Sequence, residues 1–229
     1  MTIPTLVFDY DGTLHETMHV YGPAFRESYE WLITEGYAQR QEVSSQRISS
    51  WLGMNAVDMW EDFQPDLPVE IRMQASHILG ERMLSLVREH KARWYSGVRE
   101  TLDELKEQGY PMVILSNSKI STGQTHWEEF RMEQWFAHWY DCETYDWAPK
   151  TEIIKVIQRQ MSAELIVIGD RKSDLEGAVA AGAPFIGCAY GYGSETELQG
   201  AAYLLQKPAE LLDAIRFCRR IDEGTQLSI

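Results

Sequence analysis

The sequence has little cysteine and no long apolar run, and each absence excludes a class of protein. Its three cysteines, Cys142, Cys188 and Cys218, lie far apart and lack the CxxC spacing of thiolate metal sites. Neither a disulfide framework nor a thiolate zinc site is therefore expected. No apolar run approaches the roughly 18 residues of a membrane span, and the first residues lack a signal-peptide pattern. We therefore expect a cytoplasmic protein in a reducing compartment, with no membrane partner.

Positive charge is also scarce. The chain has 21 Lys and Arg residues against 35 Asp and Glu, which gives a net charge of −14 and a pI near 4.8. Nucleic acids and anionic membrane surfaces are therefore not expected partners. An anionic small molecule would need a local positive charge or a metal ion to bind. With 229 residues and 44% hydrophobic residues, the chain is long enough for one large domain or for a domain with an insertion.

The hydrophobic pattern divides the chain into a first strand, a helical block and a region of alternating strands and helices. Residues 15–95 contain few β-rich runs and show helical periodicity. Short apolar runs typical of buried strands lie at 5–8, 112–115, 165–168 and 185–188. Helical patterns at about 98–108, 151–161 and 174–181 separate the later strands. This alternation predicts an α/β fold with a doubly wound parallel sheet.

Two aspartates two positions apart follow the first predicted strand directly. Asp9 and Asp11 would point into one small site, since side chains two apart on a strand share a direction. Like charges at that spacing repel each other unless a cation or a shared proton intervenes. Asp11-Gly12 is also a common turn dipeptide, so this segment alone does not separate a catalytic pair from a solvated turn.

Further polar residues follow the later strands of the predicted sheet. They are Ser116 and Asn117 after the strand at 112–115, Asp170 and Asp174 after the strand at 165–168, and Lys150 at the start of the helix before that strand. Each signal alone is weak, because helix caps and turns use the same residue types. Together they lie in order at the carboxyl ends of parallel strands, which is where such sheets bind ligands.

This constellation resembles the haloacid dehalogenase-like superfamily, and in particular its phosphoglycolate phosphatase-like branch. The family's first motif, Asp-x-Asp-x-Thr, reads Asp9-Tyr10-Asp11-Gly12-Thr13, and its fourth, Gly-Asp-x-x-x-Asp, reads Gly169 to Asp174. Ser116-Asn117 matches the second motif and Lys150 the third. Residues 95–98, Gly109-Tyr110 and the run Tyr190-Gly191-Tyr192-Gly193 are similar to the phosphoglycolate phosphatase-like branch.

The resemblance implies a two-domain enzyme. Residues 1–14 and 96–229 would form a Rossmann-like α/β catalytic core, and residues 15–95 an inserted helical cap. The expected reaction is hydrolysis of a small phosphorylated metabolite, a phosphoglycolate-like monoester, through an aspartyl-phosphate. Neither the identity of that metabolite nor the oligomeric state is predicted.

The resemblance also implies a role for each motif residue. Asp9 would attack phosphorus and Asp11 would act as acid and base. Ser116, Asn117 and Lys150 would bind the phosphate. Mg²⁺ would be held by Asp9, the backbone carbonyl of Asp11, and Asp170, with Asp174 as a direct ligand or a brace.

Other members of the superfamily provide alternatives. Hydrolytic dehalogenases lack the second aspartate, so Asp11 argues against C–halogen chemistry. Phosphonate-cleaving relatives use a lysine of the cap, and here no lysine precedes Lys91. A hexose-phosphate mutase shares the motifs, and a non-enzymatic binding or regulatory protein shares the fold. Both alternatives stay open at this point.

Residues outside the motifs carry weaker expectations. His15 and His19 follow the first motif and are expected to be packing or surface residues rather than metal ligands. Tyr192 and Gly193 are expected to close a loop beside the site. Arg47 and Trp51 are candidates for substrate contact in the cap, although a tryptophan in a helical domain is more often part of the core. The five aromatic residues Trp127, Phe130, Trp135, Phe136 and Trp139 are read as one helical stripe.

Overall fold

The computed structural model describes residues 3–54, 56–161 and 164–226. The chain divides into two compact units. One unit, the α/β unit, consists of Met1–Glu16 and Trp94–Ile229, and the other, the helical unit, consists of Thr17–Arg93. The first strand of the α/β unit is therefore separated in sequence from the rest of its own sheet.

Six parallel strands form the sheet of the α/β unit, in the order β3-β2-β1-β4-β5-β6. Their bounds are β1 Thr5–Phe8, β2 Met112–Ser116, β3 His138–Asp141, β4 Leu165–Gly169, β5 Phe185–Cys188 and β6 Tyr203–Leu205. The helices are α5 Val98–Glu107, α6 Ile120–Phe130, α7 Lys150–Met161, α8 Lys172–Ala181 and α9 Leu211–Gln226, with short 3-10 turns at Met132–Gln134, Glu143–Tyr145 and Pro208–Glu210. The predicted doubly wound α/β fold is confirmed.

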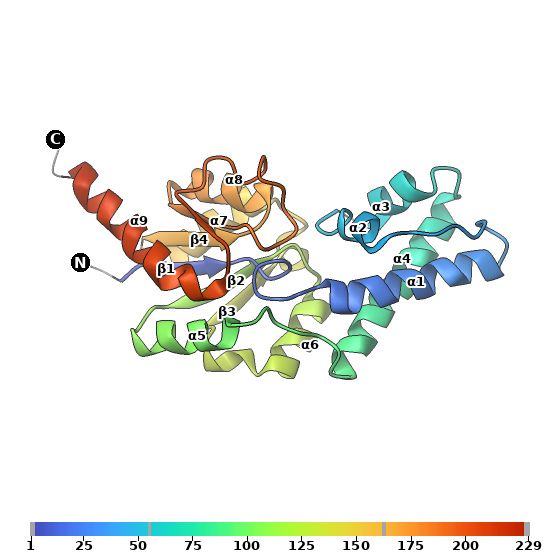
Figure 1. Cartoon of the computed structure of the whole chain (residues 1–229), viewed down its shortest axis with the longest axis horizontal. Helices are drawn as coiled ribbons and strands as arrows, with labels where there is room; N and C mark the ends of the chain where they lie inside the picture. Colours follow the sequence, from blue (N-terminus) through green and yellow to red (C-terminus); the bar gives the residue numbers. More distant parts are fainter. Residues whose placement is uncertain (1–2, 55, 162–163, 227–229) are drawn as a thin grey trace. The chain divides into compact units, whose positions relative to one another are not determined.

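Both faces of the sheet are buried, which is why its central strands are continuously apolar. On β1, Leu6 and Phe8 pack on one face of the sheet and Val7 on the other. Helices α5, α6 and α9 cover the first face, and α7 and α8 cover the second (Figure 1). The alternation follows from the two-residue period of a strand.

Strand β1 lies between β2 and β4, and this position defines the site. Phe8 pairs with Ile114 of β2 and with Ile168 of β4. The carboxyl ends of the three strands consequently meet at one edge of the sheet. The polar residues that follow these three strands in the sequence therefore lie near one another at this edge.

Two edge strands were not predicted, and the prediction of one aromatic helical stripe was wrong. Trp127 and Phe130 belong to α6, but Trp135 follows a 3-10 turn and Trp139 lies in β3. In strand β3, His138 is exposed and only the last two residues are buried. An edge strand of this kind has no continuous apolar run, and aromatic residues four apart imitate a helix. All five aromatics nevertheless pack in or against the core of the α/β unit.

The helical unit contains α1 Met18–Thr34, α2 Ser45–Ser49, α3 Ala56–Phe63 and α4 Val69–Arg88. Its core is aromatic. The ring of Phe25 on α1 lies 5.2 Å from that of Trp51 and 5.6 Å from that of Trp60, centroid to centroid. Across the described residues, none of the helices has both the length and the apolar character to cross a membrane.

Candidate functional site

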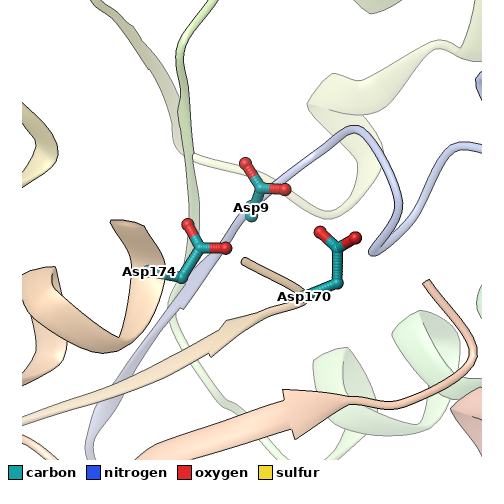
Figure 2. Close-up of side chains that lie close together, drawn as sticks. All are labelled: Asp9, Asp170 and Asp174. Carbon is teal, nitrogen blue, oxygen red and sulfur yellow. The ribbon is translucent and has the colours of Figure 1, made fainter. Parts of the chain in front are cut away.

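Three buried carboxylates meet at the carboxyl edge of the sheet. Asp9 follows β1, Asp170 follows β4, and Asp174 lies in the first turn of α8. Each offers an oxygen within 4.8 Å of the others, and the three side chains converge in Figure 2. The exposed fractions of the three residues are 7%, 0% and 2%. The structure therefore brings together the residues predicted as a metal site from motifs about 160 positions apart.

Lys150 is the positive charge of this cluster. It is the first residue of α7 and is 5% exposed. Its Nζ donates to Asp9 Oδ1 at 2.5 Å and to Asp174 Oδ1 at 2.6 Å. Of the other lysines close to these motifs in the sequence, Lys119 is exposed and Lys172 pairs on the surface with Glu176. The position at the start of α7 thus brings the lysine of the third motif into the cluster.

Burial and mutual repulsion shape the protonation of these groups. Burial raises the pKa of the Asp9 carboxyl well above its usual value. Lys150 opposes that shift, whereas Asp174 and Asp170 reinforce it. Burial, with the nearby Asp174 carboxylate, raises the pKa of Asp170 to about 7. Burial alone would lower the pKa of Lys150, but the carboxylates of Asp174 and Asp9 outweigh it and raise the pKa, so the ammonium stays charged.

The donor set fits a hard divalent cation. One ammonium faces three carboxylates, so the cluster is short of positive charge. Carboxylate oxygens are the ligands that Mg²⁺ prefers, and it commonly uses one or two of them together with water and phosphate oxygens. A cation here would also favour the ionised form of Asp9, because an adjacent positive charge lowers a carboxyl pKa.

Asp170 is held by two loops. Its Oδ2 accepts the Tyr192 backbone N–H at 2.7 Å, and its Oδ1 faces Thr13 Oγ1 at 3.5 Å. Gly12 has a φ of +87°, and a Cβ there would lie 2.3 Å from Asp170 Oδ2. A Cβ on Gly193 would lie 1.7 Å from the Asp170 carbonyl oxygen. The run that contains Tyr192 and Gly193 therefore lies against the site and requires glycine there.

Replacing Gly193 by Ala should displace Asp170. We expect the free energy of unfolding to fall by about 1–3 kcal/mol, the usual cost of overpacking. Urea unfolding measures this loss. Gly80→Ala is the matched control, because nothing lies within 4 Å of a Cβ there and alanine favours a helix interior by roughly 0.5–1 kcal/mol. If Gly193→Ala behaves like Gly80→Ala, the close approach does not matter.

The side chain of Asp11 has a different setting from that of Asp9. It is 40% exposed, and its Oδ1 lies 3.0 Å from Nδ1 of the buried His15. Within the described residues, the carboxylates close enough together to share a cation are those of Asp9, Asp170 and Asp174, and the Asp11 side chain does not belong to this group. The predicted metal contact of Asp11 through its backbone carbonyl stays a prediction. From the sequence, His15 was expected to be a packing or surface residue and was not paired with Asp11.

Ser116 is the last residue of β2, which lies beside β1, and Asn117 follows it. Ser116 is buried and Asn117 is exposed. Cys142 Sγ lies 3.1 Å from Asn117 Oδ1 and 3.6 Å from the Ser116 carbonyl oxygen. Both residues therefore lie at the same edge of the sheet as Asp9, and their predicted phosphate contacts stay predictions.

The helical unit has a groove of its own, with a volume of about 500 Å³. Arg47 and Asp62 line it and form an ion pair, and Asp62 also accepts Trp51 Nε1–H at 2.6 Å. Trp51 itself is only 2% exposed. Of the two residues considered for substrate contact, Trp51 is part of the aromatic core, and Arg47 is the one that faces an opening.

Comparisons with known proteins agree on one family. The family model described as haloacid dehalogenase-like hydrolase matches residues 6–188. The chain is 22% identical to a phosphoglycolate phosphatase of Photobacterium profundum, across 93% of this chain and 96% of that protein. It is 23% identical to the pyrophosphatase PpaX of Halalkalibacterium halodurans, across 94% and 98%. A haloacid dehalogenase-like family hydrolase from Streptococcus pneumoniae has the same fold, with a TM-score of 0.76 at 21% identity across 92% of this chain and 97% of that one.

Proposed function

Because the chain belongs to the haloacid dehalogenase-like hydrolase family, we propose that it is a phosphatase that hydrolyses the monoester of a small phosphorylated metabolite. The observation that carries this proposal is the buried Asp9 carboxylate, paired with Lys150 and close to Asp170 and Asp174. A carboxylate held beside fixed positive charge at the end of a central strand suits attack on phosphorus. The name of the Photobacterium profundum relative, phosphoglycolate phosphatase, supports the same substrate class.

Asp9 and Asp11 divide the chemistry. In the first step an oxygen of Asp9 forms a bond to phosphorus while the bond from phosphorus to the ester oxygen breaks. Asp11 gives its proton to that leaving oxygen, which departs as an alcohol. In the second step Asp11 takes a proton from water, and the water oxygen bonds to phosphorus while the bond from phosphorus to the Asp9 oxygen breaks. Inorganic phosphate then leaves and Asp9 is regenerated.

The remaining residues bind charge. Lys150 would neutralise the charge that develops on the phosphoryl oxygens, because its ammonium already contacts Asp9. Ser116 and Asn117 would hold those oxygens from the end of β2. Asp9, Asp170 and Asp174 would hold Mg²⁺, with the Asp11 backbone carbonyl as a further ligand. When bound, the ion supplies charge stabilisation to the phosphoryl group.

Removal of the metal should abolish activity and lower stability. We expect EDTA to reduce phosphate release to background and Mg²⁺ to restore it. Because Mg²⁺ would bind only the folded cluster, it should also raise the free energy of unfolding, by about 2.7 kcal/mol at 100 times its Kd. Thermal melts with and without Mg²⁺ measure this second effect independently of any substrate. Activity and melting that ignore EDTA would contradict the metal assignment.

A panel of phosphorylated metabolites tests the function itself. It should contain 2-phosphoglycolate, sugar phosphates, nucleotides, pyrophosphate and p-nitrophenyl phosphate, each assayed for phosphate release with Mg²⁺. Release from an alkyl monoester supports the proposal. Release from pyrophosphate alone would make the chain resemble PpaX instead. Conversion of a sugar phosphate to its isomer without release would favour a mutase, and tight binding without either would favour a non-enzymatic protein.

A further inference from the structure

His15 contacts the residue that the proposed function uses as acid and base. The ring lies at the end of the first motif and is fully buried. Its Nδ1 lies 3.0 Å from Asp11 Oδ1. An ionised carboxylate can only accept hydrogen bonds, so Nδ1 is the donor while Asp11 is ionised.

The backbone fixes the distance between these two residues. His15 N–H donates to the Tyr10 carbonyl at 2.9 Å, and Gly12 N–H donates to the His15 carbonyl at 3.0 Å. Asp11 therefore lies inside a closed turn whose two ends are joined by hydrogen bonds. The Tyr95 N–H also donates to the Leu14 carbonyl at 3.0 Å and anchors the turn to the segment before α5.

Aromatic packing fixes the plane of the His15 ring. It stacks on Tyr10 with centroids 5.1 Å apart and an angle of 18°, and meets His126 edge-on at 4.7 Å. Tyr10 is itself held, because its hydroxyl lies 2.7 Å from His126 Nδ1 and accepts Trp94 Nε1–H at 3.4 Å. Burial lowers the pKa of His126 to about 3, so its ring is neutral in this hydrogen bond with the Tyr10 hydroxyl.

We propose that His15 is a positioning residue that holds Oδ1 of Asp11, so that the other carboxyl oxygen carries the proton delivered to the leaving group. A carboxyl group protonated on either oxygen, and free to rotate, would present its proton in the right direction for only part of the time. An oxygen that already accepts from His15 is the poorer site for the proton. This proposal rests on the proposed function, because it assumes that Asp11 acts as the general acid.

The leaving group provides the test. An alkyl monoester releases a basic alkoxide that needs a proton, whereas p-nitrophenyl phosphate releases an anion that is stable near neutral pH. The quantity to compare is kcat/KM, because it reports the steps up to the first irreversible one and so includes departure of the leaving group. His15→Phe keeps a ring against Tyr10 and removes the donor, and His15→Asn retains an N–H donor near the position of Nδ1.

We expect His15→Phe to lower kcat/KM by about 30-fold for the best alkyl monoester of the panel, a part of the roughly 10²–10⁴-fold that general acid catalysis contributes. The loss for p-nitrophenyl phosphate should stay below about 3-fold, and His15→Asn should recover the alkyl activity to within about 3-fold of wild type. In an Asp11→Asn background, His15→Phe should change p-nitrophenyl phosphate hydrolysis by less than about 2-fold, because the residue through which it acts is gone.

Each result separates the two proposals. Equal losses for both substrates, or no loss for either, would overturn the role of His15 while leaving the phosphatase function intact. A further loss in the Asp11→Asn background would assign His15 to the structure of the turn instead. Absence of phosphate release by the wild-type protein from every substrate would overturn the proposed function, and the role of His15 with it. Thermal melts of each variant identify any that fail to fold.

Discussion

Asp9→Asn should lower kcat by at least about 10⁴-fold, the scale on which loss of a nucleophile acts. An amide does not form the phosphorylated intermediate, so the first bond to phosphorus is not made. The change preserves the shape of the side chain, in a residue that is 7% exposed. It also removes one of three like charges that converge at the site. We therefore expect the variant to stay folded and to bind phosphorylated ligands.

Phosphate release from the best substrate of the panel measures this loss. Asp213→Asn is the matched control, because it makes the same chemical change on α9, where the carboxylate is 77% exposed and pairs with Arg216 three residues later. It should retain wild-type kcat. Thermal melts should show both variants folded. Substantial turnover by a folded Asp9→Asn protein would contradict the role of Asp9 as nucleophile.

Lys150→Met should be the most destabilising change at the site. The ammonium is buried and contacts both Asp9 and Asp174. Its removal leaves these carboxylates and Asp170 with no compensating lysine, and loss of one partner of a buried ion pair costs about 3–5 kcal/mol. Urea unfolding in the presence of EDTA measures this, because a bound cation would mask part of the effect. Turnover with Mg²⁺ should also fall by about 10²–10³-fold, since a charge that stabilises the transition state is lost.

Two variants keep this prediction testable. Lys172→Met alters a lysine whose side chain is 70% exposed and should change stability by less than about 0.5 kcal/mol, as surface substitutions usually do. Lys150→Met combined with Asp174→Asn should recover at least half of the lost stability, because one unpaired carboxylate is removed with the lysine. If Lys150→Met is no less stable than Lys172→Met, the buried pairs do not stabilise the fold.

The sequence predicted the central part of the fold and missed its edges. Strands β1 and β5 have the predicted bounds, and β2 and β4 are each one residue longer than predicted. Central strands are buried on both faces, so their apolar runs are unbroken and easy to recognise. Strands β3 and β6 lie at the two edges of the sheet, where part of each strand is exposed. Strand β3 begins and ends with a polar residue, and β6 is only three residues long.

The family was predicted from its motifs, and the match over residues 6–188 confirms it. The motifs also predicted that Asp9, Asp170 and Asp174 lie at one site. This prediction was possible because residues that follow neighbouring parallel strands begin at the same edge of the sheet. The pairing of His15 with Asp11 could not be predicted in the same way. It depends on hydrogen bonds within one turn and on rings from Tyr10 and His126, which lies 111 positions after His15 in the chain. A pattern of neighbouring residues in the sequence does not predict such a contact.

The position of β1 also has a consequence for how the protein acquires its structure. The strand at residues 5–8 is synthesised first, yet its partners are residues 112–116 and 165–169. The ribosome must complete about 160 further residues before this strand is hydrogen-bonded on both sides, and loops of that length close slowly. The helical unit is one continuous segment, so it can fold during translation. Until both neighbouring strands have been synthesised, the apolar side chains of β1 are exposed and can aggregate. The four-residue length of the strand limits the apolar surface that is exposed during this time.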